Sequence, residues 1–76
     1  MRALVEFIAR ELVDYPEAVE VREWQDQRGL RLELHVAPED VGKVIGRQGR
    51  IARALRTVVR AAALRAGQRV TVEIAR

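Results

Sequence analysis

The residues with the most specific chemistry in this chain are two glycines, Gly46 and Gly49, with Arg47 and Gln48 between them. A glycine has no Cβ, so each can adopt a positive φ and lets another backbone come close. A helix is predicted to begin at Arg50, and its first backbone N–H groups have no intrahelical partner. Those donors, the positive end of the helix dipole and the Arg side chains converge on one point. The pattern therefore predicts a site for an anion such as a phosphate.

Charge is divided unevenly along the 76 residues. Residues 1–42 carry a net charge of −5 and residues 43–76 one of +8, and no acid occurs from Lys43 to Arg65. Thirteen of the fourteen basic residues are Arg, whose guanidinium binds phosphate through two parallel hydrogen bonds and stacks on bases. A genome that prefers Arg explains the choice over Lys, but it does not explain the segregation. The distribution indicates one face built for a polyanion.

The composition argues against several classes of site. The chain has no cysteine, so neither a disulfide framework nor a thiolate metal site is possible. The single histidine, His35, lacks the partners that a metal site or a His-based catalyst needs. Glu39 and Asp40 are not read as catalytic, because acids are common where a helix begins. We expect no enzyme activity, no metal or other cofactor and no small-molecule substrate.

Targeting signals are not visible either. No apolar run approaches the roughly 20 residues that a membrane span needs, and Glu6, Arg10 and Glu11 interrupt the apolar residues near the N-terminus. The sequence therefore predicts a soluble, cytoplasmic protein without a membrane partner.

Hydrophobic periodicity predicts six elements in the order α-β-β-α-α-β. They are a helix over 2–14, strands over 18–25 and 30–36, a short helix between Pro38 and Gly46, a helix over 50–65 and a strand over 69–74. The strand at 30–36 shows the clearest alternation of apolar and polar residues. Three short strands with one apolar face need helices on that face, so residues 1–76 are expected to form a single two-layer α+β sandwich.

Two predictions about side-chain burial follow from the same patterns. Trp24 is expected on the outer face of the sheet, opposite Val19 and Val21. The helix over 50–65 is expected to bury one stripe and to carry three Arg on the opposite side. The expected buried residues are Ile51, Leu55, Val58, Val59 and Ala62, and the Arg residues are Arg53, Arg56 and Arg60.

The segment Val44–Ile51 resembles the signature of the KH domain, an I-G-x-x-G-x-x-I loop between two helices, with the last apolar position at Ile51 or Ala52. The order of elements resembles the type II, bacterial form of that fold. Nearly the whole chain resembles the KhpA (YlqC) family of small bacterial RNA-binding proteins with one KH domain, including the opening helix and the Asp14-Tyr15-Pro16 run after it. The resemblance implies a mixed sheet whose middle strand lies beside the last one.

The resemblance also implies a mechanism, in which the G-x-x-G loop clamps the backbone of about four unpaired nucleotides. The two glycines would admit the sugar–phosphate backbone, other side chains would contact phosphates, and an apolar wall would receive the bases. The sheet edge near His35 and Val36 would lie opposite that wall. The expected RNA-binding residues are Gly46, Arg47, Gln48 and Gly49 in the loop, Lys43, Arg50 and Arg53 in a basic rim, and Val41, Val44 and Ile45 in the wall.

Aromatic residues make up only 4% of the chain, so no stacking platform is available and one such site should bind RNA weakly and with strong salt dependence. The family resemblance implies that useful affinity comes from pairing, either as a homodimer or with a second KH-domain protein. It also implies an RNA chaperone or adaptor role in translation, ribosome biogenesis or control of cell elongation.

Two other functions remain open at this stage. A helix-turn-helix module that binds duplex DNA is possible, because two helices joined by a glycine turn superficially fit, although the flanking strands argue against it. The chain could also be a protein-interaction module, acting in dimerisation with little RNA binding. Under each of these functions, Phe7 and Trp24 are expected to be packing or dimer contacts and not residues that stack on bases.

Overall fold

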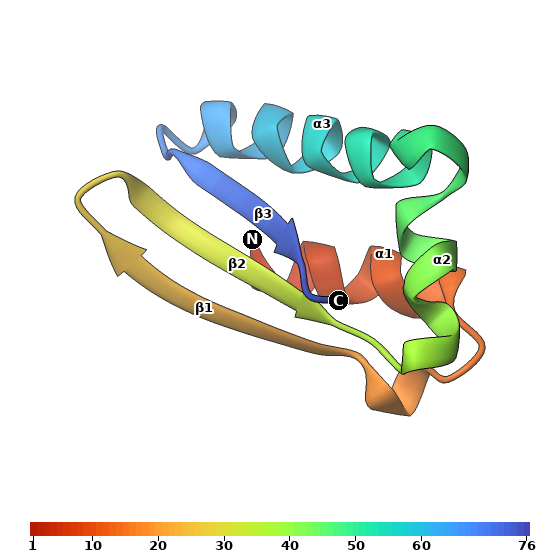
Figure 1. Cartoon of the computed structure of the whole chain (residues 1–76). Coiled ribbons are helices and arrows are strands. Elements are labelled where there is room, and N and C mark those ends of the chain that lie inside the picture. The colour runs from red at the N-terminus through yellow and green to blue at the C-terminus, as the bar shows by residue number, and fades with distance from the viewer.

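The computed structural model describes residues 1–76 and confirms the predicted order of helices and strands. Figure 1 shows α3 running above β3, with α1 behind the strands. Three short 3-10 turns, Pro16–Ala18, Pro38–Asp40 and Arg47–Gly49, connect the main elements. The main elements are α1 (Arg2–Leu12), β1 (Glu20–Asp26), β2 (Gly29–His35), α2 (Val41–Ile45), α3 (Arg50–Arg65) and β3 (Val70–Ile74).

The sheet is mixed, with the strand order β1-β2-β3. β1 and β2 form an antiparallel hairpin in which Trp24 lies opposite Arg31. β2 and β3 are parallel, with Leu32 opposite Val72, and a parallel pair requires a long crossover, here made by α2 and α3. The middle strand therefore lies beside the last one, as the resemblance implied.

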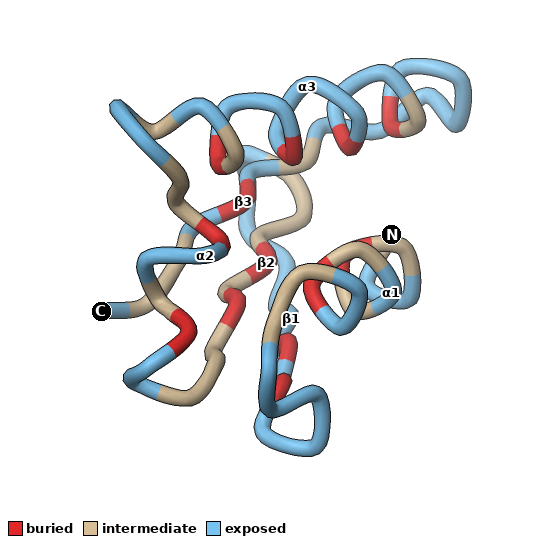
Figure 2. Tube along the Cα trace, turned by 90° about the vertical axis from the view of Figure 1, so that its right-hand side faces the viewer, coloured by how far each residue is buried: buried red, intermediate tan, exposed pale blue.

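The core lies between one face of the sheet and the two long helices, which confirms the two-layer α+β sandwich. Figure 2 shows the buried residues of α1 and α3 turned toward the strands. Leu34, near the end of β2, is completely buried, as the alternating pattern predicted. The other buried core residues are Val5, Ala9, Val19, Val21, Leu32, Val44, Leu55, Val59 and Val72.

The buried stripe of α3 differs from the prediction. Ala52 and Ala63 are buried, whereas Val58 is 48% exposed and Ile51 and Ala62 are only partly buried. Leu55 and Val59 are buried as predicted, whereas Val58 lines a groove beside α1. Hydrophobicity alone ranks Val above Ala, so periodicity missed the two buried Ala residues and included Val58.

Several predicted boundaries are also shifted by one or two residues. The first helix ends at Leu12 rather than 14, and the three strands occupy 20–26, 29–35 and 70–74. The predicted bounds of α3, 50–65, are confirmed. Ends of elements shift in this way because they depend on caps and on tertiary contacts more than on local pattern.

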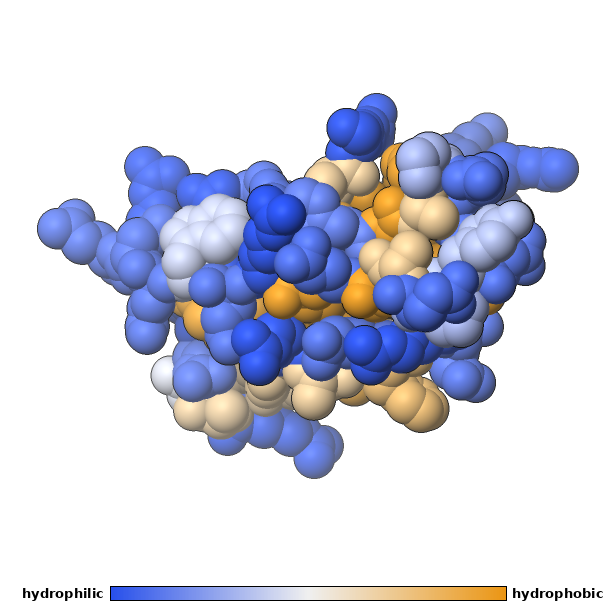
Figure 3. All heavy atoms as spheres, turned by 90° about the horizontal axis from the view of Figure 1, so that it is seen from below, coloured by the Kyte–Doolittle hydropathy of each residue, from blue (hydrophilic) through white to orange (hydrophobic).

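The outer face of the sheet carries charged side chains held in ion pairs. The Arg31 guanidinium lies 5.8 Å from the centroid of the Trp24 ring and also pairs with Glu73 and Asp26. Trp24 is 43% exposed on this face, as predicted. The view from below, toward the β1 edge, shows a mostly hydrophilic surface with narrower apolar areas (Figure 3). Such charge discourages pairing with a foreign strand at an open edge.

None of the helices is both long enough and apolar enough to cross a membrane.

Because Leu34 is fully buried, Leu34→Ala should lower the free energy of unfolding by about 2–5 kcal/mol, measured by urea denaturation. The control is Leu64→Ala, which makes the same change in a side chain that is 74% exposed and should cost less than about 1 kcal/mol. A loss of only a few tenths for Leu34→Ala would contradict the inward orientation of β2.

Candidate functional site

The loop between α2 and α3 needs both of its glycines, for different reasons. Gly46 has φ +77°, and a Cβ there would lie 2.9 Å from the backbone N of Ile51 and closer still to its side chain. Gly49 has φ +74°, but no atom lies within 4 Å of where its Cβ would be. Gly46 therefore allows the loop to pack on α3, whereas Gly49 supplies a backbone conformation and leaves open space beside it.

Gln48 stands between these glycines in a left-handed conformation, with φ 57°. Its side-chain oxygen accepts a hydrogen bond from Arg50 Nη2 at 3.3 Å, and its carbonyl oxygen accepts one from Arg53 Nη2 at 3.4 Å. Two guanidinium groups are thereby held over the loop. A left-handed Gln is uncommon, and strain of this kind is concentrated at functional sites.

No acid neutralises the cations of this loop. Arg47, Arg50 and Arg53 are exposed and take part in no ion pair. They surround the beginning of α3, where the positive end of the helix dipole favours negative charge. The structure thus brings together the loop residues predicted for phosphate contact.

Lys43, expected in the same basic rim, is paired with two acids. Its ammonium lies 2.9 Å from Asp14 Oδ2 and 3.6 Å from Asp40 Oδ1. The carboxylates of Asp14 and then Asp40 raise the pKa of Lys43, so it remains charged. Because these two acids already neutralise it, Lys43 adds less to the rim than the three Arg do.

Asp40 is the one buried charged residue of the molecule. Its carboxylate accepts hydrogen bonds from the backbone N–H groups of Asp14, at 3.1 Å, and Tyr15, at 3.0 Å. Burial alone would raise the pKa of Asp40, but these N–H groups and the Lys43 ammonium together lower it below its usual value. The sequence pattern predicted Asp40 at a helix N-terminus, where the dipole favours an acid, and the structure confirms that position. The contact with Asp14 and Tyr15 was not predicted.

The expected apolar wall is smaller than predicted. Val44 is completely buried in the core and cannot contact a base, which corrects its place among the predicted RNA-binding residues. Val41 and Ile45 remain partly exposed. A hollow of about 420 Å³ is lined by Val41, His35 and Val36 together with Pro38, Ala75 and Arg76. Of the three residues expected in the apolar wall, only Val41 lines this hollow together with the sheet edge near His35 and Val36.

The remaining Arg residues of α3 follow the helix toward its C-terminus. Arg56 Nε donates a hydrogen bond to the carbonyl oxygen of Val72 at 3.0 Å, so this side of α3 faces β3. Arg53 and Arg60 lie three residues before and four residues after Arg56, on the same side of the helix. A row of cations thus begins at the loop and follows the α3–β3 side of the molecule.

The structure contains no group of three or more His, Cys, Asp or Glu side chains that could hold a metal ion. His35 Nε2 lies 2.6 Å from Glu33 Oε1, as a single pair on β2. The unpaired Arg side chains of the loop and of α3 support the electrostatic binding of an extended anion.

Comparison with known proteins agrees with this geometry. A family model described as KhpA/KhpB, KH domain, matches residues 2–74. The chain is 58% identical over 74 residues to the RNA-binding protein KhpA of Clostridium perfringens, covering 97% of this chain and 99% of the relative. It is 47% identical to the RNA-binding protein KhpA of Aquifex aeolicus, covering 97% and 94% of the two chains.

A solved structure shows the same fold. The chain aligns with a crystal structure of Era from Aquifex aeolicus with a TM-score of 0.71 and 19% identity. The alignment covers 96% of this chain and 28% of that one. At this identity the likeness concerns the fold alone.

The lowered pKa of Asp40 predicts how stability depends on pH. In the unfolded chain Asp40 titrates near 3.8, so as the pH falls the unfolded state binds a proton before the folded state does. The stabilisation is fully present above about pH 5 and is lost as the pH falls through 3.8 toward the lower folded value. Asp40→Asn should be less stable at pH 7 and should show a flatter pH dependence of the urea midpoint.

Glu39→Gln, at the exposed neighbouring residue, is the control and should leave the pH dependence of the midpoint near that of the unmodified chain. An equally steep acid loss in Asp40→Asn and in the unmodified chain would show that other carboxylates dominate.

Proposed function

Since the chain belongs to the KhpA/KhpB KH-domain family, we propose that it binds single-stranded RNA at the loop of Gly46, Arg47, Gln48 and Gly49. The observation that carries the proposal is the loop itself, which combines open space at Gly49 with three Arg side chains that no acid pairs. The unpaired guanidinium groups and the positive end of the α3 dipole favour phosphates.

Phosphates would lie against the loop, where Arg47, Arg50 and Arg53 supply charge. Bases would turn toward the hollow lined by Val41, His35 and Val36, with Ile45 beside them. Such a site clamps about four nucleotides through their backbone and therefore tolerates many sequences. Its affinity depends mainly on phosphate contacts, so it weakens steeply as salt rises.

The role proposed for the chain is that of a binding protein and not of an enzyme. Residues 1–76 would act as one KH unit in the cytoplasm. A clamp that tolerates many sequences suits an RNA chaperone or adaptor in translation, ribosome biogenesis or control of cell elongation.

A second observation favours pairing between two copies. Six apolar side chains line a groove of about 190 Å³ between α1 and α3: Ile8, Leu12, Ile51, Ala54, Leu55 and Val58. α3 carries five Arg and no acid, whereas α1 carries two Arg and two Glu, so placing α1 of one copy against α3 of the other avoids opposing two Arg-rich helices. In a dimer with twofold symmetry, α1 of each copy would lie against α3 of the other, and the groove of each copy would be covered.

The test of the RNA site is the affinity for fluorescent single-stranded RNA across a salt titration. Arg47→Asp combined with Gln48→Asp puts two carboxylates where phosphates would lie and should weaken binding at least about tenfold. A matched control, Ala3→Asp with Arg10→Asp, makes the same change in net charge at two exposed positions of α1 and should bind nearly as the unmodified chain does.

Circular dichroism establishes that both double variants are folded. Equal binding by the loop variant and the unmodified chain would refute the loop as the RNA site. Tighter binding to duplex DNA than to single-stranded RNA would favour the helix-turn-helix alternative, and no binding to either would favour a pure interaction module.

The pairing is tested by sedimentation at high micromolar concentration. The unmodified chain should sediment as a dimer, and Val58→Glu should sediment as a monomer, because it puts a charge into the groove from a half-exposed position without disturbing the core. Thr57→Glu, exposed on the adjacent residue, is the control and should weaken the dimer less. A monomeric mass for the unmodified chain would exclude pairing between identical copies.

A further inference from the structure

The cations of the first half of the chain are all neutralised except one. Arg2, Arg10, Arg22 and Arg31 each lie within 4.0 Å of a carboxylate oxygen. Arg28, in the turn between β1 and β2, has no such partner. Unpaired Arg side chains are common in the basic second half of the chain, but Arg28 is the only one in the first half.

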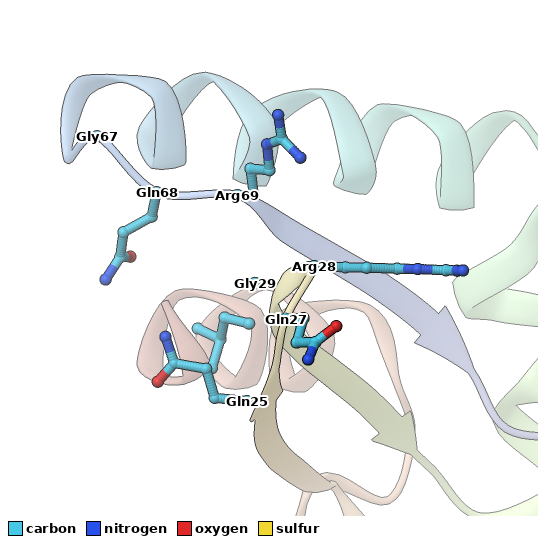
Figure 4. A pocket seen from close by; sticks show the side chains of 8 residues that line it. Gln25, Gln27, Arg28, Gly29, Gly67, Gln68 and Arg69 are labelled. Atoms are coloured by element: carbon cyan, nitrogen blue, oxygen red, sulfur yellow. The ribbon is translucent and has the colours of Figure 1, made fainter.

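Arg28 lines a hollow of about 290 Å³ where two turns meet. One turn joins β1 to β2, and the other joins α3 to β3 and contributes a second unpaired cation, Arg69. The remaining lining residues are Gln25, Gln27, Gly29, Leu30, Gly67 and Gln68. Figure 4 shows Gln25 and Gln68 on the same side of the two turns, while Arg69 extends toward α3 and Arg28 extends away from both Gln side chains.

The two turns are fixed to each other by the backbone, so the hollow is present before any ligand arrives. The N–H of Leu30 donates to the carbonyl oxygen of Arg69 at 2.9 Å. A Cβ at Gly29, whose φ is +118°, would lie 2.8 Å from the Cβ of Arg69, so only glycine allows this approach. A rigid, preformed site loses little entropy when it binds.

The polar groups around the hollow are free to bind a ligand. None of the three Gln side chains makes a hydrogen bond within the protein. The nearby Asp26 carboxylate is occupied, because it accepts from the backbone N–H of Arg28 at 2.7 Å and lies 4.0 Å from Arg31. The carbonyls at the end of α3 are partly satisfied by the N–H groups of Gly67 and Gln68. Guanidinium groups suit phosphates, and amides suit the edges of bases.

The row of Arg residues on α3 leads from the G-x-x-G loop to this hollow. Arg53, Arg56 and Arg60 share the side of the helix that faces β3, and β3 begins directly after Arg69. From Arg50 to Gly67 the path is roughly 25 Å at about 1.5 Å per residue. That length corresponds to about seven stacked nucleotides at about 3.4 Å each, and to fewer in an extended strand.

We propose that the hollow lined by Arg28, Arg69, Gln25 and Gln68 is a second contact site for the same RNA strand, binding an unpaired nucleotide beyond the four held at the loop. This inference rests on RNA binding at the loop. The row of Arg on α3 guides the strand between the two sites. RNA long enough to reach the hollow therefore binds more tightly than a fragment that fills only the loop.

The test compares two single-stranded RNA probes, one of about five and one of about fourteen nucleotides, and measures their dissociation constants by fluorescence anisotropy in a salt titration. Arg28→Gln with Arg69→Gln should weaken binding of the long probe about tenfold and leave that of the short probe unchanged. The slope of log affinity against log salt for the long probe should become shallower by about 1.4, since each lost phosphate contact on a single strand removes about 0.7.

A control variant, Arg10→Gln with Arg22→Gln, makes the same change in net charge away from the hollow and should affect the long probe by less than about twofold. Gln25→Ala with Gln68→Ala should also weaken the long probe only. If both probes bind the unmodified chain equally, or if the Arg28 and Arg69 variant matches its control, the second site is refuted while the loop stands. If neither probe binds, RNA binding at the loop is refuted as well.

Discussion

The position of the G-x-x-G loop depends on one buried carboxylate. The Asp40 carboxylate accepts hydrogen bonds from the backbone N–H groups of Asp14 and Tyr15, which follow α1 and are 26 and 25 residues away in sequence. It also lies beside the Lys43 ammonium. A buried charge is tolerated only when such partners surround it. α2 has five residues, which is too short for a helix to be stable by itself. The carboxylate therefore fastens α2 to the rest of the domain, and α2 in turn sets the position of Gly46 and the loop.

Basic side chains that are paired with acids and basic side chains that are not lie in different parts of the molecule. In α1 and the β1–β2 hairpin, acids outnumber basic residues and neutralise nearly all of them, and Asp14 and Asp40 extend the same arrangement to Lys43. In α3 no acid is present and the Arg side chains remain unpaired. The Arg side chains of the first half are thus nearly all paired, although that half carries a net charge of −5, while those of α3 have no carboxylate partner. Net charge alone, at +3, conceals this division.

Local pattern was sufficient for most of the architecture and for the loop. Alternation identified β2 with Leu34 inward, and the glycines between two helices identified the turn, because both depend on residues close together in sequence. Local pattern could not predict which residues of α3 are buried or that Val44 is buried, because burial depends on how each helix packs against the sheet. The tertiary partners of Asp40 and Lys43 were not predicted for a similar reason: Asp14, which contacts both, is nearly 30 residues from Lys43. The hollow at Arg28 and Arg69 also joins two turns that are distant in sequence.

The hydrogen bond from Arg56 to Val72 has a consequence for what the β3 edge can accept. β3 is an edge strand, with β2 on one side only, and such edges attract extended peptides that add a further strand. The guanidinium of Arg56 occupies a backbone acceptor in the middle of that edge, and the helix that carries it lies alongside. A peptide competing for the edge would have to displace both. A peptide that adds a strand at this edge would thus have to break the Arg56 hydrogen bond, whereas an anion bound to the Arg row of α3 would not.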